Sequence, residues 1–411
     1  MRYVIIGNSV AAVNACQGIR ELDREGTITI ISAENYYAYG RPLISYWLEG
    51  KTDFEKMPYQ PVEFYQKNKI NVLLGKKAVG LDVNRREVKL DDGSSLPYDR
   101  LLIATGGQAI VPPLTGLTAE DYFTFLTYDD VLRLARRASP GKEVVVLGAG
   151  PSGLKAMESL VTRGARVTLV ELASRIWSLV LDREAAALIT RFLEEQGVTV
   201  ILQDTILGGR RNNEGRLELD LQSGRQLTCD ILVVAIGVRP NTELLEKVAG
   251  VNLNRGVVVD EYLSIGLPGI YAAGDVVAGG PPLLPHAARQ GRIAGRNMAG
   301  GREKYIAGPA YNALGFLGLH TISIGISAPE PEEGYEILAE KREEGRIYRK
   351  LVLDNNRLVG ALFINEFDRA GLYRRLIEEQ VDVTPFKDNL LQKGFGFLHL
   401  PRELWEGKLG E

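Results

Sequence analysis

The stretch EVVVLGAGPSG, residues 143–153, decides how this chain folds. Its apolar residues predict a buried β-strand, and the turn that follows has the spacing G-x-G-x-x-G. Such a turn between a strand and a helix directs backbone N–H groups and the helix dipole at a pyrophosphate. The residues predicted to contact a dinucleotide here are Gly148, Gly150, Pro151, Ser152 and Gly153.

An acidic residue follows this turn at the distance that a dinucleotide site requires. Glu171 ends the next predicted strand, 171 − 148 = 23 positions after the first glycine, close to the usual separation of about 20. A carboxylate there accepts hydrogen bonds from the ribose hydroxyls and repels a 2′-phosphate, which favours NAD(H) over NADP(H). Arg175 lies near enough to soften this preference. Gly237, after a later buried strand, completes the residues predicted for this site.

The same pattern occurs at the start of the chain. GNSVAA, residues 7–12, follows a strand predicted at residues 2–6 and fits the degenerate form G-x-S-x-x-A. Gly7 permits the tight turn, Ser9 leaves the backbone close to a pyrophosphate, and Ala12, next to Ala11, allows close packing of helix and strand. Glu34 stands 34 − 7 = 27 positions on, where a carboxylate could bind a ribose. By itself this motif is also typical of a plain strand–helix turn.

This repetition predicts the domain organisation. The two copies lie about 140 residues apart, and each later has a buried strand followed by glycine, LLIATG at 101–106 and LVVAIG at 232–237. We expect an α/β protein with two Rossmann-like domains and a small α+β C-terminal domain. The expected domains are residues 1–112 with 241–307, residues 113–240, and residues 308–411.

Composition excludes several classes of function. A net charge of −3 leaves no electrostatic footprint for nucleic acid. No apolar run reaches the roughly 18 residues that span a bilayer, and the first residues do not resemble a signal peptide, so a cytoplasmic location is expected. Cys16 and Cys229 lie 229 − 16 = 213 positions apart, and with three histidines they predict neither an iron–sulfur cluster nor a metal site. Redox chemistry must then rest on an organic cofactor.

Taken together, the two turns, ATG at 104–106 and GIYAAGD at 269–275 resemble the FAD-dependent pyridine-nucleotide oxidoreductases, which are two-dinucleotide-domain flavoproteins related to glutathione reductase. The resemblance covers about residues 1–300. YGRPLIS at 39–45 is similar to an element of the rubredoxin- and ferredoxin-reductase branch and of the flavin portion of nitrite reductases. The segment at 360–371 also resembles this branch, and the overall pattern of the chain is similar to the NAD-dependent flavoprotein associated with carbon monoxide dehydrogenase.

The resemblance implies that the first turn and Glu34 bind FAD and the second turn binds NAD(H), with NADP(H) less favoured. It implies that Asp275 hydrogen-bonds the ribityl chain of FAD, with a helix N-cap as the alternative role. Arg41 matches a basic residue beside FAD, and a solvated surface arginine is its alternative. His286 fits a structural role as well as a contact near the flavin. The other residues assigned to FAD are Pro42, Val79 (whose backbone would meet the adenine), Ala104, Thr105, Gly106 and Gly274.

Two departures from the family shape the expected chemistry. Disulfide reductases need a cysteine pair beside the flavin, and this chain has no cysteine between positions 17 and 228. A thiol mechanism is therefore disfavoured. Lys155 stands where relatives usually carry glutamate near the reactive edge of the flavin. As a candidate catalytic residue it would favour anionic reduced flavin by Coulomb attraction, whereas the alternative is a surface lysine on a helix.

The function expected from these features is hydride transfer between NAD(H) and FAD and electron transfer between FAD and a small iron–sulfur protein of the rubredoxin or ferredoxin kind. Two rival functions remain open, NADH oxidation by O2 or a quinone and a redox sensor with little turnover. In relatives the C-terminal region helps to form dimers, which leaves a homodimer open. Its aromatic residues are expected in the core rather than at a docking surface: Phe316, Tyr373, Phe395, Phe397 and Trp405.

Overall fold

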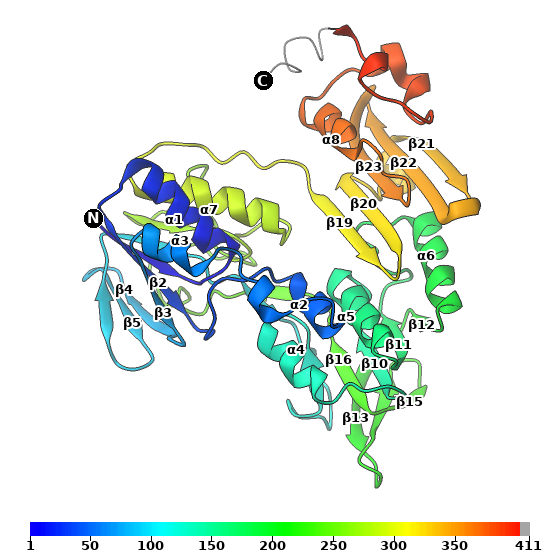
Figure 1. Ribbon diagram of the computed structural model, residues 1–411, viewed down its shortest axis with the longest axis horizontal. Helices are drawn as coiled ribbons and strands as arrows, with labels where there is room; N and C mark the ends of the chain where they lie inside the picture. Colours follow the sequence, from blue (N-terminus) through cyan, green and yellow to red (C-terminus); the bar gives the residue numbers. More distant parts are fainter. Residues whose placement is uncertain (403–411) are drawn as a thin grey trace. The chain divides into compact units, whose positions relative to one another are not determined.

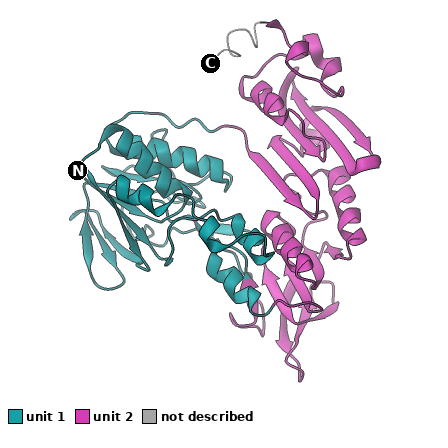
Figure 2. Cartoon of the chain, in the orientation of Figure 1, with its two compact units in different colours: residues 1–112, 124–137, 236–307 teal, residues 113–123, 138–235, 308–411 magenta. Residues whose placement is uncertain are grey.

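A computed structural model describes residues 1–402 of the chain. Contacts divide the chain into two compact units (Figure 2). The first comprises residues 1–112, 124–137 and 236–307, and the second comprises residues 113–123, 138–235 and 308–411. Each unit is described by itself below.

The first unit is built on a five-stranded parallel sheet with the order β18-β7-β1-β2-β3. Its strands are Arg2–Ile6 (β1), Thr27–Ser32 (β2), Ile70–Leu74 (β3), Arg100–Ile103 (β7) and Ile270–Ala272 (β18). The strands β1, β2, β7 and β18 are rich in buried apolar residues, as expected for a parallel sheet covered on both faces, whereas the edge strand β3 buries only Ile70.

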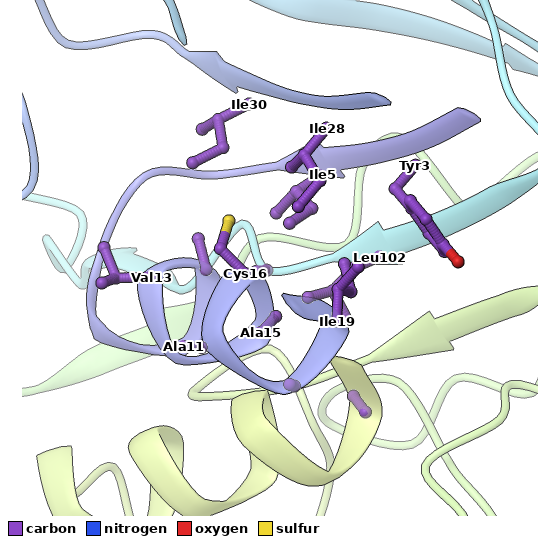
Figure 3. Close-up of a cluster of buried hydrophobic side chains, with 14 of the residues drawn as sticks. Tyr3, Ile5, Ala11, Val13, Ala15, Cys16, Ile19, Ile28, Ile30 and Leu102 are labelled. Carbon is purple, nitrogen blue, oxygen red and sulfur yellow. The ribbon is translucent and has the colours of Figure 1, made fainter. Parts of the chain in front are cut away.

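Two helices pack against each other over this sheet, Val10–Leu22 (α1) and Leu284–Met298 (α7) (Figure 1). Glycine makes their close approach possible. A Cβ added at Gly291 would lie 2.1 Å from the carbonyl oxygen of Ala11, and one at Gly295 would lie 2.1 Å from that of Ala15. The apolar side of α1 faces the sheet, where Cys16 lies among Ile5, Ile28 and Ile30 (Figure 3).

Smaller elements complete the first unit. They are the helices Leu43–Leu48 (α2), Val62–Lys67 (α3) and Tyr128–Ala135 (α4), the antiparallel sheet of Ala78–Asp82 (β4), Glu87–Leu90 (β5) and Ser95–Pro97 (β6), and the pair Gly107–Ala109 (β8) with Val238–Pro240 (β17). Helix α4 begins with a capping box between Thr127 and Asp130, which satisfies two backbone donors.

The second unit contains another five-stranded sheet, in the order β12-β11-β10-β16-β9, in which β10 pairs in parallel with β11 and β16, and β11 with β12. Its strands are Tyr122–Thr124 (β9), Glu143–Leu147 (β10), Arg166–Glu171 (β11), Thr199–Leu202 (β12) and Ile231–Val234 (β16). Pro151–Thr162 (α5) and Arg183–Glu195 (α6) are its helices, and Ile206–Arg211 (β13), Leu217–Leu221 (β14) and Gln226–Cys229 (β15) form an antiparallel sheet.

The C-terminal part of the second unit is an antiparallel sheet in the order β19-β20-β23-β22-β21. Its strands are Tyr311–Phe316 (β19), Leu319–Gly325 (β20), Glu336–Arg342 (β21), Ile347–Asp354 (β22) and Arg357–Ile364 (β23), and Ala370–Glu378 (α8) packs on it. Of the aromatic residues expected in the core, Phe316, Tyr373 and Phe395 are buried. Phe397 is 41% exposed, so that prediction is wrong, because it lies in a short surface turn. Trp405 lies outside the described residues.

The internal repeat is confirmed in the hydrogen bonding. The N–H of Gly7 donates to the carbonyl of Ile31 at 2.9 Å, and the N–H of Gly148 donates to that of Val170 at 2.8 Å. The chain therefore makes the same kind of turn at Gly7, after β1, and at Gly148, after β10.

The α/β class with a small C-terminal domain is confirmed. The contact-based division differs from the expected domain boundaries, since it groups residues 124–137 and 236–240 with the first unit and the C-terminal sheet with the second. Among residues 1–402, no helix is both long and apolar enough to cross a membrane.

Candidate dinucleotide sites

The two glycine turns have backbone conformations and close contacts that only glycine tolerates. Gly7 has φ of +113°, and a Cβ there would lie 1.9 Å from the carbonyl oxygen of Ala104. Gly148 has φ of +104°, and a Cβ at Gly153 would lie 1.9 Å from the carbonyl oxygen of Gly148. These positions require glycine because a side chain would strain the backbone or strike a neighbouring carbonyl.

The helices behind the turns leave donors available to a ligand. Ser9 is the N-cap of α1 and Gly150 is the N-cap of α5, and neither N-terminus receives a side-chain cap. Pro151 occupies the first turn of α5, where its missing N–H costs nothing. A Cβ added at Gly150 would meet no protein atom within 4 Å. Each turn therefore offers N–H groups to a ligand, and Gly150 borders open space of the kind that a pyrophosphate would occupy.

Small buried residues let the first turn pack closely. Ala12 is fully buried, and Ala11 faces Gly274, whose added Cβ would lie 3.2 Å from the Ala11 Cβ. Ala104 donates from its N–H to the carbonyl of Ile6 at 2.8 Å. The structure thus brings these predicted FAD residues together at the carboxyl ends of β1, β7 and β18, where ligands of open α/β sheets bind.

Glu34 and Arg41 form an ion pair with each other. The hydroxyl of Tyr39 donates to Glu34 at 2.7 Å and accepts from the N–H of Tyr128 at 2.9 Å. Arg41 also donates to the carbonyl of Leu126 at 3.2 Å. Arg41 is therefore not a solvated surface arginine, because 28% of its side chain is exposed and its donors are directed inwards. Pro42 directly follows as the N-cap of α2.

Asp275 is a partly buried carboxylate without a partner in the described part of the chain. It follows β18 and lines a hollow together with Gly274, His286 and Gln290. Burial raises its pKa above the usual range, and the positive charge of Arg41 opposes this shift. Asp275 does not cap α7, whose N-cap is Leu283. The alternative role as the N-cap of that helix is wrong, and the carboxylate is available to hydroxyl donors.

Several hydrogen bonds hold the turns of the first site in place. Gln290 accepts from the N–H of Gly274 at 2.8 Å, which fixes the turn before Asp275. His286 Nδ1 lies 3.5 Å from the hydroxyl of Tyr305. Thr105 and Asn241 exchange two hydrogen bonds, of 2.8 and 2.9 Å, beside Gly106, which has φ of +64°.

Val79 lies at an irregularity of the β4–β5 ladder. The register shifts between Ala78 and Gly80, so Val79 has no partner across the ladder, and its side chain is exposed. This geometry is compatible with a backbone contact to a ligand.

Glu171, the acidic residue of the second site, is hydrogen-bonded to the glycine turn of that site. One carboxylate oxygen of Glu171 accepts from the N–H of Ala149 at 2.7 Å and the other from the N–H of Ala173 at 2.8 Å. Gly237 is grouped with the first unit, where its carbonyl accepts from the N–H of Ile110 at 3.0 Å. The other residues predicted for NAD(H) all lie in the second unit.

Lys155 is not a surface lysine. Its ammonium forms an ion pair with Glu158 and lies 3.3 Å from the carbonyl oxygen of Gly315, and 14% of its side chain is exposed. The alternative of a surface lysine is therefore wrong. The partner Glu158 offsets much of the positive charge, so an effect on the flavin stays a prediction.

Neither cysteine is suited to thiol chemistry. Cys16 and Cys229 are both buried and free, and burial raises the pKa of each thiol to about 12. A nucleophilic or redox-active thiol is normally a thiolate. The geometry thus supports dinucleotide binding at each turn, without a redox-active disulfide.

The sequence did not reveal the residues that position the first site by hydrogen bonds. The hydroxyl of Tyr39 links Glu34 to the N-terminus of α4, and the 124–137 segment that contains α4 comes from the middle of the chain. Gln290 and Asn241 likewise hold turns in place. The glycine and carboxylate spacings could not reveal these residues, because their role depends on contacts between distant segments.

Comparison with known proteins agrees with this geometry. Residues 1–291 match the family model described as pyridine nucleotide-disulphide oxidoreductase, and residues 310–381 match the rubredoxin NAD+ reductase C-terminal domain. The ε subunit of NADH-dependent phenylglyoxylate dehydrogenase from Aromatoleum evansii is 32% identical over 95% of this chain and 94% of its own length. Rubredoxin-NAD(+) reductase from Pseudomonas putida is 33% identical over 67% of this chain and 71% of its own length.

A solved structure shows the same fold. The covalent putidaredoxin reductase–putidaredoxin complex contains a chain with a TM-score of 0.85 and 23% identity, covering 93% of this chain and 94% of that chain. The family's name refers to a disulfide, which the two buried free cysteines do not form here. The chain belongs to the pyridine nucleotide-disulphide oxidoreductase family and is an FAD- and NAD(H)-dependent oxidoreductase.

Proposed function

We propose that this protein passes electrons between NAD(H) and a small iron–sulfur protein of the rubredoxin or ferredoxin kind, by way of bound FAD. The observation that carries the proposal is the pair of glycine turns, each before a helix, in a chain whose two thiols are buried and have pKa values raised by that burial. With no thiol to relay electrons, the flavin itself must exchange them with the acceptor. Bound flavin supplies this chemistry, since it accepts a hydride and releases electrons singly.

The residues of the first unit fit FAD. The turn at Gly7 would hold the pyrophosphate. Glu34 would release Arg41 and accept hydrogen bonds from the adenosine ribose. Arg41 would then remain beside the phosphates. The unpartnered carboxylate of Asp275 would accept from hydroxyls of the ribityl chain. FAD would thus give Asp275 a hydrogen-bond partner, and it would give Glu34 and Arg41 partners in place of each other.

The residues of the second unit fit NAD(H). The turn from Gly148 to Gly153 would hold the pyrophosphate at the N-terminus of α5. Glu171 lies at the carboxyl end of β11, where it would accept from the hydroxyls of the adenosine ribose. The protein contributes position and electrostatics, and no residue has to act as a covalent nucleophile.

The named relatives support a protein partner. One is a rubredoxin-NAD(+) reductase, and residues 310–381 match the C-terminal domain of that enzyme class. Another relative, matched over nearly the whole chain and nearly its own length, is a subunit of an NADH-dependent dehydrogenase. A second candidate function follows from that full-length match, namely the NAD(H)-reacting subunit of a larger oxidoreductase. In both cases the C-terminal domain would form interfaces, including that of a homodimer.

Anaerobic titration with NADH, followed by visible absorbance, tests the proposal. We expect the purified protein to be yellow and its flavin absorbance to bleach with NADH. Rubredoxin and ferredoxin should then restore the absorbance faster than O2 or a quinone. A preparation that binds no FAD, or whose flavin NADH does not bleach, would contradict the proposal. Preferential reoxidation by O2 or quinone would identify an NADH oxidase instead.

A further inference from the structure

The loop between β11 and α6, residues 172–182, is hydrogen-bonded to the glycine turn of the NAD(H) site. The N–H of Trp177 donates to the carbonyl of Ala149 at 3.0 Å, and Glu171 holds the N–H groups of Ala149 and Ala173. The loop thus lies beside the place where the adenosine ribose of the coenzyme would bind. A group in this loop is well placed to respond to a phosphate on that ribose.

Arg175 is the one basic residue in residues 172–182. Its guanidinium donates to the carbonyls of Leu181 at 2.9 Å and Ser178 at 3.1 Å. It also forms an ion pair with Glu330 at 3.2 Å, and 17% of its side chain is exposed. The cation that would otherwise attract a 2′-phosphate is therefore occupied by two carbonyls and a carboxylate.

Glu330 belongs to the segment that follows β20 and is held in place by its surroundings. It is the N-cap of the 3-10 turn Pro331–Glu333, and its N–H donates to Glu333 at 2.9 Å. A second contact joins the same segment to the loop, since the hydroxyl of Ser327 donates to the carbonyl of Val180 at 2.8 Å. Two contacts from this segment therefore hold the loop and Arg175.

We propose that Glu330 is a coenzyme-selecting residue, which keeps Arg175 neutralised so that the site discriminates against the 2′-phosphate of NADP(H). The inference rests on the proposed use of NAD(H) by the second unit. Glu171 repels the extra phosphate directly, and Glu330 removes the counter-charge that would compensate for it. Selectivity would then depend on a residue about 160 positions away from the acidic residue of the fingerprint.

Binding of coenzyme fragments tests this proposal without turnover. Calorimetry on FAD-loaded protein would compare ADP-ribose with ADP-ribose 2′-phosphate in wild type and in Glu330→Gln. An exposed ion pair has a modest strength, so we expect the variant to gain about 2- to 5-fold in relative affinity for the 2′-phosphate. The gain should shrink at high salt because the interaction is Coulombic.

Two further variants identify the cause. Glu332→Gln removes the same charge from the same turn at an exposed residue that has no ion pair in the described structure, and it should leave the affinity ratio unchanged. Arg175→Met should abolish the effect of Glu330→Gln if that effect acts through the guanidinium.

Three results would overturn the proposal: an unchanged ratio in Glu330→Gln, an equal gain in Glu332→Gln, or a full gain in the Arg175→Met background. If wild type is reduced by NADH while the ratio stays unchanged in Glu330→Gln, only this inference fails. If NADH neither binds nor bleaches the wild-type flavin, the proposed function fails as well.

Discussion

Lys155 and Glu158 form a buried ion pair on helix α5, the helix that the NAD(H) turn opens. Glu158 also accepts from the backbone N–H of Leu317 at 2.8 Å, in the turn between β19 and β20. Leu317 has φ of +49°, a conformation that is unfavourable for leucine. The pair therefore anchors a strained turn of the C-terminal sheet to the coenzyme-binding helix.

Breaking this pair should destabilise the protein. Lys155→Met leaves Glu158 as a buried charge with a lone backbone donor, and the loss of one partner of a buried pair costs about 3–5 kcal/mol. Urea unfolding would measure this loss in the free energy of unfolding. The double variant Lys155→Met, Glu158→Gln should recover part of it. A flavin reduction potential that is the same in Lys155→Met and in wild type would contradict a role of Lys155 in tuning the flavin, because the single variant alone changes the net charge of the pair.

A methyl group at Gly150 should weaken NADH binding without harming the fold. Its backbone is extended, with φ of −79°, and an added Cβ would meet only open space. Gly150→Ala should therefore raise the Kd for NADH at least tenfold, equivalent to about 1.4 kcal/mol, with an unchanged Tm. Gly153→Ala is the contrasting variant, because its Cβ would lie 1.9 Å from the Gly148 carbonyl oxygen and should lower the Tm. Tight NADH binding by Gly150→Ala would contradict pyrophosphate binding at this turn.

Asp275→Asn should weaken FAD binding but stabilise the FAD-free protein. The lost charged acceptor should raise the Kd for FAD about 10- to 100-fold, because such hydrogen bonds contribute about 1.5–3 kcal/mol. In the FAD-free protein, burial raises the pKa of Asp275, so the ionised carboxyl destabilises the folded state once the pH exceeds that pKa.

The sign of this second effect is testable by pH. The Tm gain of FAD-free Asp275→Asn should be present at neutral pH and disappear as the pH falls through the raised pKa, where the wild-type carboxyl becomes neutral. Thermal unfolding of both proteins across this range would check it. A gain that persists in acid would show that charge burial is not its cause.

Tyr39→Phe should loosen the first site. The change removes the donor to Glu34 and the acceptor for the N–H of Tyr128, and each buried group left unsatisfied costs about 1–3 kcal/mol. We expect faster FAD loss on dilution, measured by the return of flavin fluorescence. Tyr36→Phe is the matched control, since its hydroxyl donates to Asp129 at an exposed place. Equal FAD loss from both variants would show that the Tyr39 hydroxyl has no special role.

Much of the fold followed from the sequence, because its signals are local. The strand at residues 2–6, the strand at 143–147 and their glycine turns were predicted where β1 and β10 lie. A glycine directly after a short apolar run is typical of a strand that ends in a tight turn, so Gly7 and Gly148 mark their turns without tertiary information. Domain boundaries depend on contacts between distant segments, since the structure groups residues 124–137 with the first unit.

What the sequence determined by itself was the pair of dinucleotide turns and the lack of a usable thiol, since both depend on residue type and spacing along the chain. Only the tertiary structure decided how the charges are used. Arg41 pairs with Glu34, Lys155 with Glu158 and Arg175 with Glu330. The physical reason is that an ion pair forms only within about 4 Å. Which of the 52 acidic residues comes that close to a given cation depends on the packing of distant segments.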